Sequence, residues 1–233
     1  MPEKHRWEAN PGRFGYRCEK CFVLARDPRQ DTECMGGMEE EKSATNTFGC
    51  VNATIRLRSG KYFDLANPQP DQFTLQDIAG ALSKICRFGG QCPDFYSVAE
   101  HSVHCYRQAV ADGCTIEQRV AVLFHDAPEA FCGDVVKPLK NLLPQYSEIE
   151  SRIEQVIADS LGINFADHAD VIQEIDHAML IAERRELFDA DGVKWFGEDT
   201  VRALDPDIQI WFPDRAEAMF MVAVSECLKA EAV

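Results

Sequence analysis

One short segment combines the residue types that metal and proton-transfer chemistry require. Residues 122–134 read VLFHDAPEAFCGD, so an apolar stretch is suddenly interrupted by a histidine and several acids. On a helix, His125 and Glu129 are four residues apart and project from one face, and Asp126 can flank the same point. Pro128 lacks an amide hydrogen and should bend such a helix. We therefore expect an imidazole and carboxylates to gather here.

Two other positions place ligand-type side chains on apolar helix faces. His101 shares a predicted face with Val98 and Cys105, and Asp176 lies among apolar residues of a later predicted helix. Each has an ordinary alternative, because a core histidine is often satisfied by a backbone carbonyl and a helix acid is often solvated. Carboxylates nevertheless seldom occupy an apolar face unless they are paired or coordinating.

Together, His101, His125, Asp126 and Asp176 form a donor set suited to Mn, Co, Fe, Zn or Mg, with positions open for water and substrate. A divalent ion in such a site lowers the pKa of bound water and neutralises charge on a phosphoryl group. Glu129 is one helical turn from His125 and is not needed as a ligand, so it is the better candidate for the general base.

This His, His-Asp, Asp pattern resembles that of the HD-domain metal-dependent phosphohydrolases. Further motifs resemble the compact bacterial and phage subgroup, which includes 5'-deoxynucleotidases and phage dATP triphosphohydrolases. The likeness runs from about residue 51 to about residue 230 and is densest from 78 to 140. Its motifs are IAGAL at 78–82, ICRFGG at 85–90, FYSVAEHSV at 95–103, GDVVKPLK at 133–140 and WFP at 211–213.

The resemblance implies a role for each matching residue. The metal ligands would be His101, His125, Asp126 and Asp176, and the acids that handle the attacking water and leaving group would be Glu129 and Asp134. The other role open to Asp134 is to cap the following short helix. The implied substrate-binding residues are Arg87, Phe88, Lys137, Pro138 and Lys140. Many relatives carry Trp after that arginine, so Phe88 is a departure in one wall of the pocket.

The expected function is metal-dependent hydrolysis of deoxynucleotide phosphates, with dATP cleaved to deoxynucleoside and triphosphate as the first candidate. That preference depends on the likeness of residues 78–140 to the phage enzymes and on Arg87, Lys137 and Lys140 as cations for a long phosphate chain. The alternatives are a 5'-deoxynucleotidase acting on monophosphates and an HD enzyme acting on a signalling nucleotide such as ppGpp.

Residues 1–49 differ in kind from the rest, because they contain few aliphatic side chains. Such a segment cannot bury enough apolar surface to fold without a cross-link such as a bound metal ion. The pattern Cys18-x-x-Cys21 with His5 and Cys34 predicts a structural Cys3His zinc module, with Cys50 as the substitute ligand if His5 is free. The alternative is a disordered tail with incidental cysteines.

A function of another class would use this N-terminal module as a nucleic-acid or protein adaptor. Its basic residues are Arg13, Arg17, Lys20, Arg26 and Arg29. Four acids interleave with them, namely Glu8, Glu19, Asp27 and Asp31. The electrostatic footprint for a nucleic acid is therefore poor.

Local signals predict a mostly α protein with a short β-hairpin, beside the small zinc module over 1–49, and the resemblance implies that residues 50–233 form an HD-domain helical bundle. Alternating residues at 51–58 and 61–65 around Ser59-Gly60 predict the hairpin. Capping-box patterns predict helices that begin at Thr74, Thr115, Ser147 and Asp214, and Gly162 should end one of them.

The 233 residues are 45% hydrophobic and 27% charged, which is ordinary globular composition. A net charge of −15 argues against an extended DNA-binding or anionic-membrane surface, but a metal and a few cations could still hold a small nucleotide. With no signal peptide or membrane span evident, we expect a cytoplasmic protein, in the host cytoplasm if it is phage-encoded. The apolar last helix (219–224) suggests a homo-oligomer or, alternatively, part of the protein's own core.

Overall fold

A computed structural model describes residues 7–9, 16–18, 24–25 and 53–230. The chain divides into two compact units, Met1–Asn52 and Ala53–Val233. In the first unit, an antiparallel sheet is ordered β1-β2-β3, and Cys18 pairs with Trp7. Its strands are β1 (Trp7–Ala9), β2 (Tyr16–Cys18) and β3 (Leu24–Ala25). The predicted zinc ligands His5, Cys21 and Cys34, and the substitute Cys50, lie outside the described residues, as does the side chain of Cys18.

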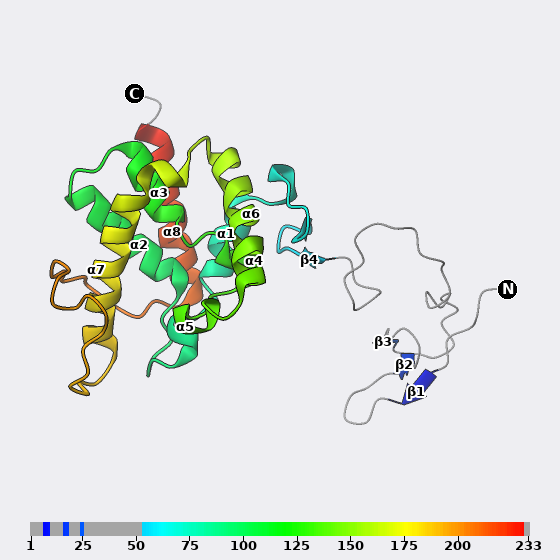
Figure 1. The fold of residues 1–233 in the computed structure, drawn as a ribbon. Coiled ribbons are helices and arrows are strands. Elements are labelled where there is room, and N and C mark those ends of the chain that lie inside the picture. Colours follow the sequence, from blue (N-terminus) through cyan, green and yellow to red (C-terminus); the bar gives the residue numbers. More distant parts are fainter. Residues whose placement is uncertain (1–6, 10–15, 19–23, 26–52, 231–233) are drawn as a thin grey trace. The chain divides into compact units, whose positions relative to one another are not determined.

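The second unit is mostly helical, as predicted, with one small antiparallel hairpin (Figure 1). Its elements are β4 (Thr54–Arg56), β5 (Tyr62–Asp64), η1 (Pro70–Gln72), α1 (Leu75–Leu82), η2 (Arg87–Gly90), α2 (Val98–Ala111), α3 (Ile116–Phe124), α4 (Glu129–Cys132), α5 (Lys137–Lys140), α6 (Pro144–Leu161), η3 (Phe165–His168), α7 (Ala169–Leu187) and α8 (Pro213–Ala230).

The hairpin forms where alternation predicted it. Ile55 of β4 pairs with Phe63 of β5, and the fully buried Phe63 ring stacks on Phe131 of α4. Gly60 adopts a φ of 90°, which favours a residue without a side chain. The hairpin thus packs against the helical core through Phe63.

Three of the predicted helix boundaries are confirmed. Thr74 and Thr115 cap α1 and α3 in capping boxes with Asp77 and Gln118. Gly162 ends α6 in the left-handed region, at a φ of 68°.

Two of the predicted helix starts are wrong by a few residues, because proline was the stronger local signal. Helix α6 begins at Pro144 instead of near Ser147, and α8 begins at Pro213 instead of after Asp214. Proline is favoured in the first turn of a helix, where its missing amide hydrogen costs nothing.

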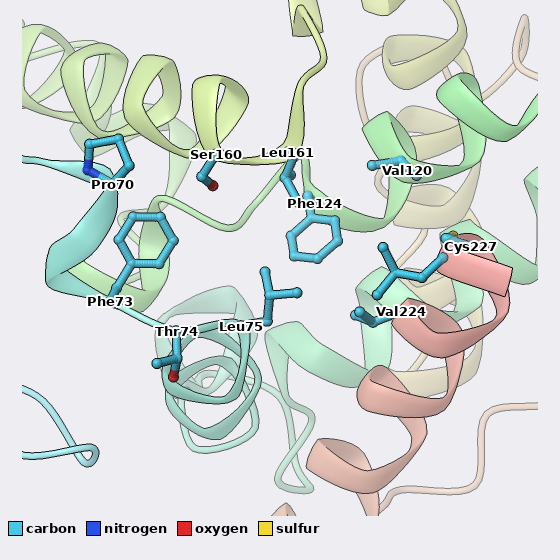
Figure 2. Close-up of a pocket in the computed structure, with 11 residues that line it drawn as sticks. Pro70, Phe73, Thr74, Leu75, Val120, Phe124, Ser160, Leu161, Val224 and Cys227 are labelled. Carbon is cyan, nitrogen blue, oxygen red and sulfur yellow. The ribbon is translucent and has the colours of Figure 1, made fainter. Parts of the chain in front are cut away.

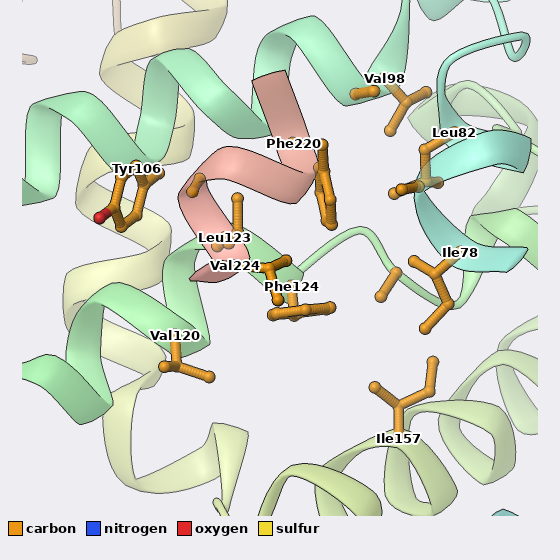
Figure 3. Packing of buried hydrophobic residues seen from close by; sticks show 14 of the residues in the cluster. Ile78, Leu82, Val98, Tyr106, Val120, Leu123, Phe124, Ile157, Phe220 and Val224 are labelled. Carbon is orange, nitrogen blue, oxygen red and sulfur yellow. The ribbon is translucent and has the colours of Figure 1, made fainter. Parts of the chain in front are cut away.

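The buried residues form two clusters. The larger joins α1, α2, α3, α6 and α8 with the hairpin, and it includes Ile78, Leu123 and Phe220 (Figure 3). The smaller lies where α7 runs beside α2 and α3, and it includes Val122 and Met179 (Figure 1). Helices α2, α3 and α7, which contain or adjoin the predicted ligands, are therefore packed directly against one another.

Helix α8 contributes mainly to the unit's own core. Phe220 and Val224 are buried there, whereas Val222 is 47% exposed. An association through this helix stays a prediction. Within the described part of the chain, no helix has the length and apolarity needed to cross a bilayer.

Candidate functional site

Three elements supply the side chains singled out in the sequence. Ser97 caps α2 and so sets the start of the helix that carries His101, whose side chain is fully buried. Asp176 extends from the middle of α7. His125 and Asp126 follow the end of α3.

The expectation that His125 and Glu129 share one continuous helix is wrong. Helix α3 ends at Phe124, and α4 begins at Glu129. Between them the backbone makes tight turns, with the Ala127 amide donating to the Phe124 carbonyl (2.9 Å) and the Glu129 amide to that of Asp126 (3.1 Å). Pro128 has no amide hydrogen to continue the α-helical ladder, so the helix is interrupted here instead of only bending.

The four predicted ligands nevertheless converge. The Nε2 atom of His101 lies 3.3 Å from His125 Nε2, 3.5 Å from Asp126 Oδ2 and 3.2 Å from Asp176 Oδ1. His125 Nε2 lies 3.3 Å and 3.7 Å from the same two carboxylate oxygens. Around an ion bound at about 2.0–2.2 Å, neighbouring donor atoms stand about 3.0–3.5 Å apart, so this spacing fits a shared metal.

The backbone and a neighbouring acid orient both imidazoles toward that common point. His125 Nδ1 donates to the Val122 carbonyl at 2.7 Å, and His101 Nδ1 donates to Glu183 at 2.5 Å. With the Nδ1 hydrogens so occupied, both Nε2 atoms face the cluster. The Asp176 side chain is 41% exposed, so the cluster opens to solvent beside it.

Besides imidazole nitrogens and carboxylate oxygens, a cysteine sulfur also lies in the cluster. Donor atoms of His101, Cys105 and His125 lie within 4.8 Å of one another, and this group could hold a metal ion. The Cys105 sulfur stands 3.5 Å from His101 Nε2 and is fully buried. The resemblance did not imply a role for this cysteine.

The charges in the cluster stabilise one another. Burial opposes the ionised form of Asp126, but His125 and His101 outweigh it and hold its pKa below the usual range; Asp176 behaves in the same way. Burial also opposes protonation of His125, but Asp126 and Asp176 raise its pKa well above the ordinary value. Without a metal, the imidazoles therefore tend to hold protons that an ion would displace.

Glu129 and Asp134 stand beside this cluster as a pair of unusual acids. Burial, with the nearby charges of Asp126 and Asp134, raises the pKa of Glu129 to about 9. Its Oε2 is buried and lacks a hydrogen-bond partner among the described residues. Burial also raises the pKa of Asp134. Asp134 does not cap α5, because Val136 occupies that position without a side-chain hydrogen bond.

Arg87 is not placed as a free phosphate-binding group would be, because its guanidinium already lies beside two carboxylates. Its guanidinium is buried and lies 3.3 Å from Asp126 Oδ2 and 3.2 Å from Glu183 Oε2. The next residue, Phe88, packs edge-to-face against Phe188 at 5.2 Å between ring centroids.

The other implied substrate contacts lie around α5. Lys140 donates to Glu150 at 2.6 Å, whereas Lys137 and Pro138 are exposed. Their contacts with a substrate stay predictions.

Sequence reasoning missed Glu183, which is fully buried and contacts His101, Tyr96 and Arg87. One signal could have found it: Glu183 lies seven residues after Asp176, two helical turns along the same face of α7. An acid on a core-facing helix surface is the pattern that had singled out Asp176.

A pocket of about 430 Å³ lies elsewhere, between α1, α3, α6 and α8 (Figure 2). It is mainly apolar, and its lining includes Phe73, Phe124 and Val224. None of the predicted site residues in the described part of the chain lines it. A functional site chosen by cavity shape alone would therefore be this pocket and not the polar cluster.

Two known proteins are similar in sequence to this chain. It is 41% identical over 141 residues to the uncharacterized protein YfdR of Escherichia coli, covering 60% of this chain and 76% of that one. It is 32% identical over 149 residues to the uncharacterized Rhodobacter capsulatus protein RCAP_rcc00048, covering 61% of this chain and 74% of the other. No family model matches. The chain belongs to the family of these uncharacterized proteins.

Proposed function

We propose that this protein is a metal-dependent phosphohydrolase of the HD type that acts on deoxynucleotides. The observation that carries the proposal is the convergence of two imidazole nitrogens and two carboxylate oxygens, which all lie 3.2–3.7 Å from one another in the five pairs measured. They come from three separate helical regions, so local sequence does not explain their meeting.

The residues His101, His125, Asp126 and Asp176 would hold the divalent ion. Mn, Co, Fe, Zn and Mg are all compatible with nitrogen and carboxylate donors. When bound, such an ion supplies Lewis-acid polarisation of a water and of a phosphate oxygen. When both imidazoles are neutral, the three carboxylates of Asp126, Asp176 and Glu183 outnumber the single positive charge of Arg87, and this favours a cation at this place.

Glu129 is the candidate proton acceptor for the attacking water. Its buried Oε2 is not engaged by any described side chain or amide, so the atom can receive a proton. A carboxylate with a raised pKa is a stronger base once it is ionised, and the positive charge of a bound divalent ion would favour that ionised form. Asp134, also with a raised pKa, is the candidate donor of a proton to the leaving oxygen.

One observation favours monophosphates over triphosphates as substrates. Two of the three cations expected to meet a long phosphate chain are already paired, Arg87 with Asp126 and Glu183, and Lys140 with Glu150. Only exposed Lys137 forms no ion pair within the described part of the chain. The paired cations therefore favour a 5'-deoxynucleotidase, and a dATP triphosphohydrolase is the other candidate.

Product analysis tests the proposal. The full chain is incubated with all common deoxyribonucleoside and ribonucleoside mono- and triphosphates in Mg²⁺, Mn²⁺, Co²⁺ or Zn²⁺, and products are separated by chromatography. Intact triphosphate from dATP supports the first activity, and phosphate released only from deoxynucleoside monophosphates supports the second. An inert protein across the whole panel contradicts the proposal.

The role of Glu129 is tested in the same assay. Glu129→Ala should lower kcat by at least about 100-fold, since general acid–base groups contribute on that order. The control is Glu148→Ala, at an exposed position of α6, which should keep wild-type activity. Full activity in Glu129→Ala would remove it from the mechanism.

A further inference from the structure

Glu183 occupies a position that the proposed chemistry does not use. Its side chain is fully buried in α7, and one of its oxygens, Oε1, is 2.5 Å from His101 Nδ1 and 2.8 Å from the Tyr96 hydroxyl. Its other oxygen faces Arg87 at 3.2 Å. A buried carboxylate is costly unless it is paired: the hydrogen bonds of Glu183 fall on Oε1, whereas Oε2 has only the ion-pair contact with Arg87.

The contact with His101 has a chemical consequence at the far side of the ring. A neutral imidazole carries one hydrogen, and a carboxylate acceptor at Nδ1 fixes that hydrogen there. The lone pair then lies on Nε2, which faces His125, Asp126 and Asp176. The negative charge beside Nδ1 also makes Nε2 a stronger donor to a metal.

Arg87 extends this arrangement to a second member of the cluster. One of its terminal nitrogens lies 3.2 Å from Glu183, and the other lies 3.3 Å from Asp126 Oδ2. His101, Glu183, Arg87 and Asp126 therefore form a continuous polar chain that begins and ends on a proposed ligand. The Tyr96 hydroxyl, which is not a member of this polar chain, donates a hydrogen bond to the Glu183 carboxylate and holds it in place.

We infer that Glu183 is a positioning residue that sets the tautomer and the donor strength of His101, and that Arg87 couples it to Asp126. The inference depends on the proposed metal site. It assigns Arg87 to holding the metal ligands, in place of the phosphate contact expected from the sequence. Glu183 itself would touch neither metal nor substrate.

Metal affinity is the direct test, measured by calorimetric titration of the chelator-treated full chain with Mn²⁺. Mn²⁺ prefers oxygen and nitrogen donors to thiolates, so the N-terminal cysteines compete little for it. Glu183→Gln keeps the shape of the side chain but removes its charge, and should weaken Mn²⁺ binding by about 10- to 100-fold. The matched control is Glu186→Gln, an exposed position three residues further along α7, which should bind as wild type does.

A second variant keeps the inference testable if Glu183→Gln does not fold. Tyr96→Phe removes only the hydroxyl that holds the Glu183 carboxylate, and should weaken Mn²⁺ binding by a smaller factor of about 3 to 10. A merely structural role would lower the melting temperature of these variants but leave their Mn²⁺ affinity unchanged.

The outcomes separate the two claims. The inference is supported if wild type binds Mn²⁺ and folded Glu183→Gln binds it more weakly. If Glu183→Gln does not fold, weaker binding by Tyr96→Phe supports it instead. Wild-type affinity in that folded variant overturns the inference and leaves the proposed metal site standing. A wild-type chain that binds no Mn²⁺ overturns both.

Discussion

At the scale of single residues, the candidate site is a set of charges that depend on one another. Burial and the nearby Arg87 oppose protonation of His101, but Cys105, Glu183 and Asp176 raise its pKa well above the usual value. Asp126 and Asp176 have the same effect on His125. A metal ion must displace these protons, so binding and proton release are linked.

This linkage predicts the direction in which metal affinity changes with pH. Because protons compete for the two imidazoles, Mn²⁺ should bind more weakly at pH 6 than at pH 8, and binding should release protons. Calorimetry in buffers of different ionisation enthalpy measures both quantities. An affinity that does not change between these pH values would contradict the assignment of His101 and His125 as ligands.

The raised pKa of Glu129 leads us to expect a second pH effect, on the free energy of unfolding of the metal-free protein. Its pKa is about 9 in the folded chain and near the ordinary 4.5 when unfolded, so between these values the folded state holds the extra proton. The stabilising contribution is complete below about pH 4.5 and is lost as the pH rises toward 9.

Glu129→Gln removes this titration. Relative to the variant, wild type should lose up to about 1.4 kcal/mol of unfolding free energy per pH unit within that window. Urea denaturation at pH 5 to 9 with chelator present measures the difference. Parallel pH profiles for the two proteins would show that burial does not raise the pKa of Glu129.

At the scale of elements, the sequence predicted those helix ends that are decided by residues close to them in the chain. Thr74 and Thr115 could be identified as caps because a capping box lies within four residues. The break at Pro128 was expected only as a bend, since sequence shows the missing amide hydrogen but not whether the packing lets the helix resume. Glu183 escaped notice because its partners are distant in the chain and meet it only after α2 and α7 pack.

The segment after α7 offers a test of packing at the element scale. Gly192 and Gly197 both have positive φ, at 75° and 79°. A Cβ at Gly192 would meet nothing within 4 Å, whereas one at Gly197 would overlap the imidazole of His177. That ring in turn donates from Nε2 to the Phe196 carbonyl at 2.8 Å, so it cannot move freely.

Alanine at the two glycines should therefore have unequal effects. Gly192→Ala should cost about 1–2 kcal/mol of unfolding free energy, from backbone strain alone. Gly197→Ala should cost roughly 1–3 kcal/mol more, because the side chain at His177 must also shift. Urea denaturation measures both, and equal costs would mean that Gly197 does not pack against His177.

At the scale of the whole molecule, helices α2, α3 and α7 support both the smaller core cluster and the polar cluster. A ligand that joins residues on all three should stabilise the entire unit. The sequence identified the four converging residues, but only the fold shows that Arg87 and Lys140 are already paired, because that depends on which acids packing brings beside them.

Metal removal should accordingly destabilise the second unit as a whole. At a Mn²⁺ concentration 100 times its Kd, binding adds about 2.7 kcal/mol, which corresponds to a rise in Tm of about 5–10 °C for a domain of this size. Differential scanning calorimetry with Mn²⁺ or with chelator measures the shift. His125→Ala is the control and should show almost none; a similar shift in that variant would place the metal elsewhere.

The most direct test of the central claim is the initial rate of deoxynucleotide hydrolysis as Mn²⁺ is added back to chelator-treated protein. The account predicts no hydrolysis before addition, a saturable rise in wild type, and loss of at least about 100-fold in Asp126→Asn at every Mn²⁺ concentration. Hydrolysis that persists in excess chelator, or an Asp126→Asn variant as active as wild type, would contradict it.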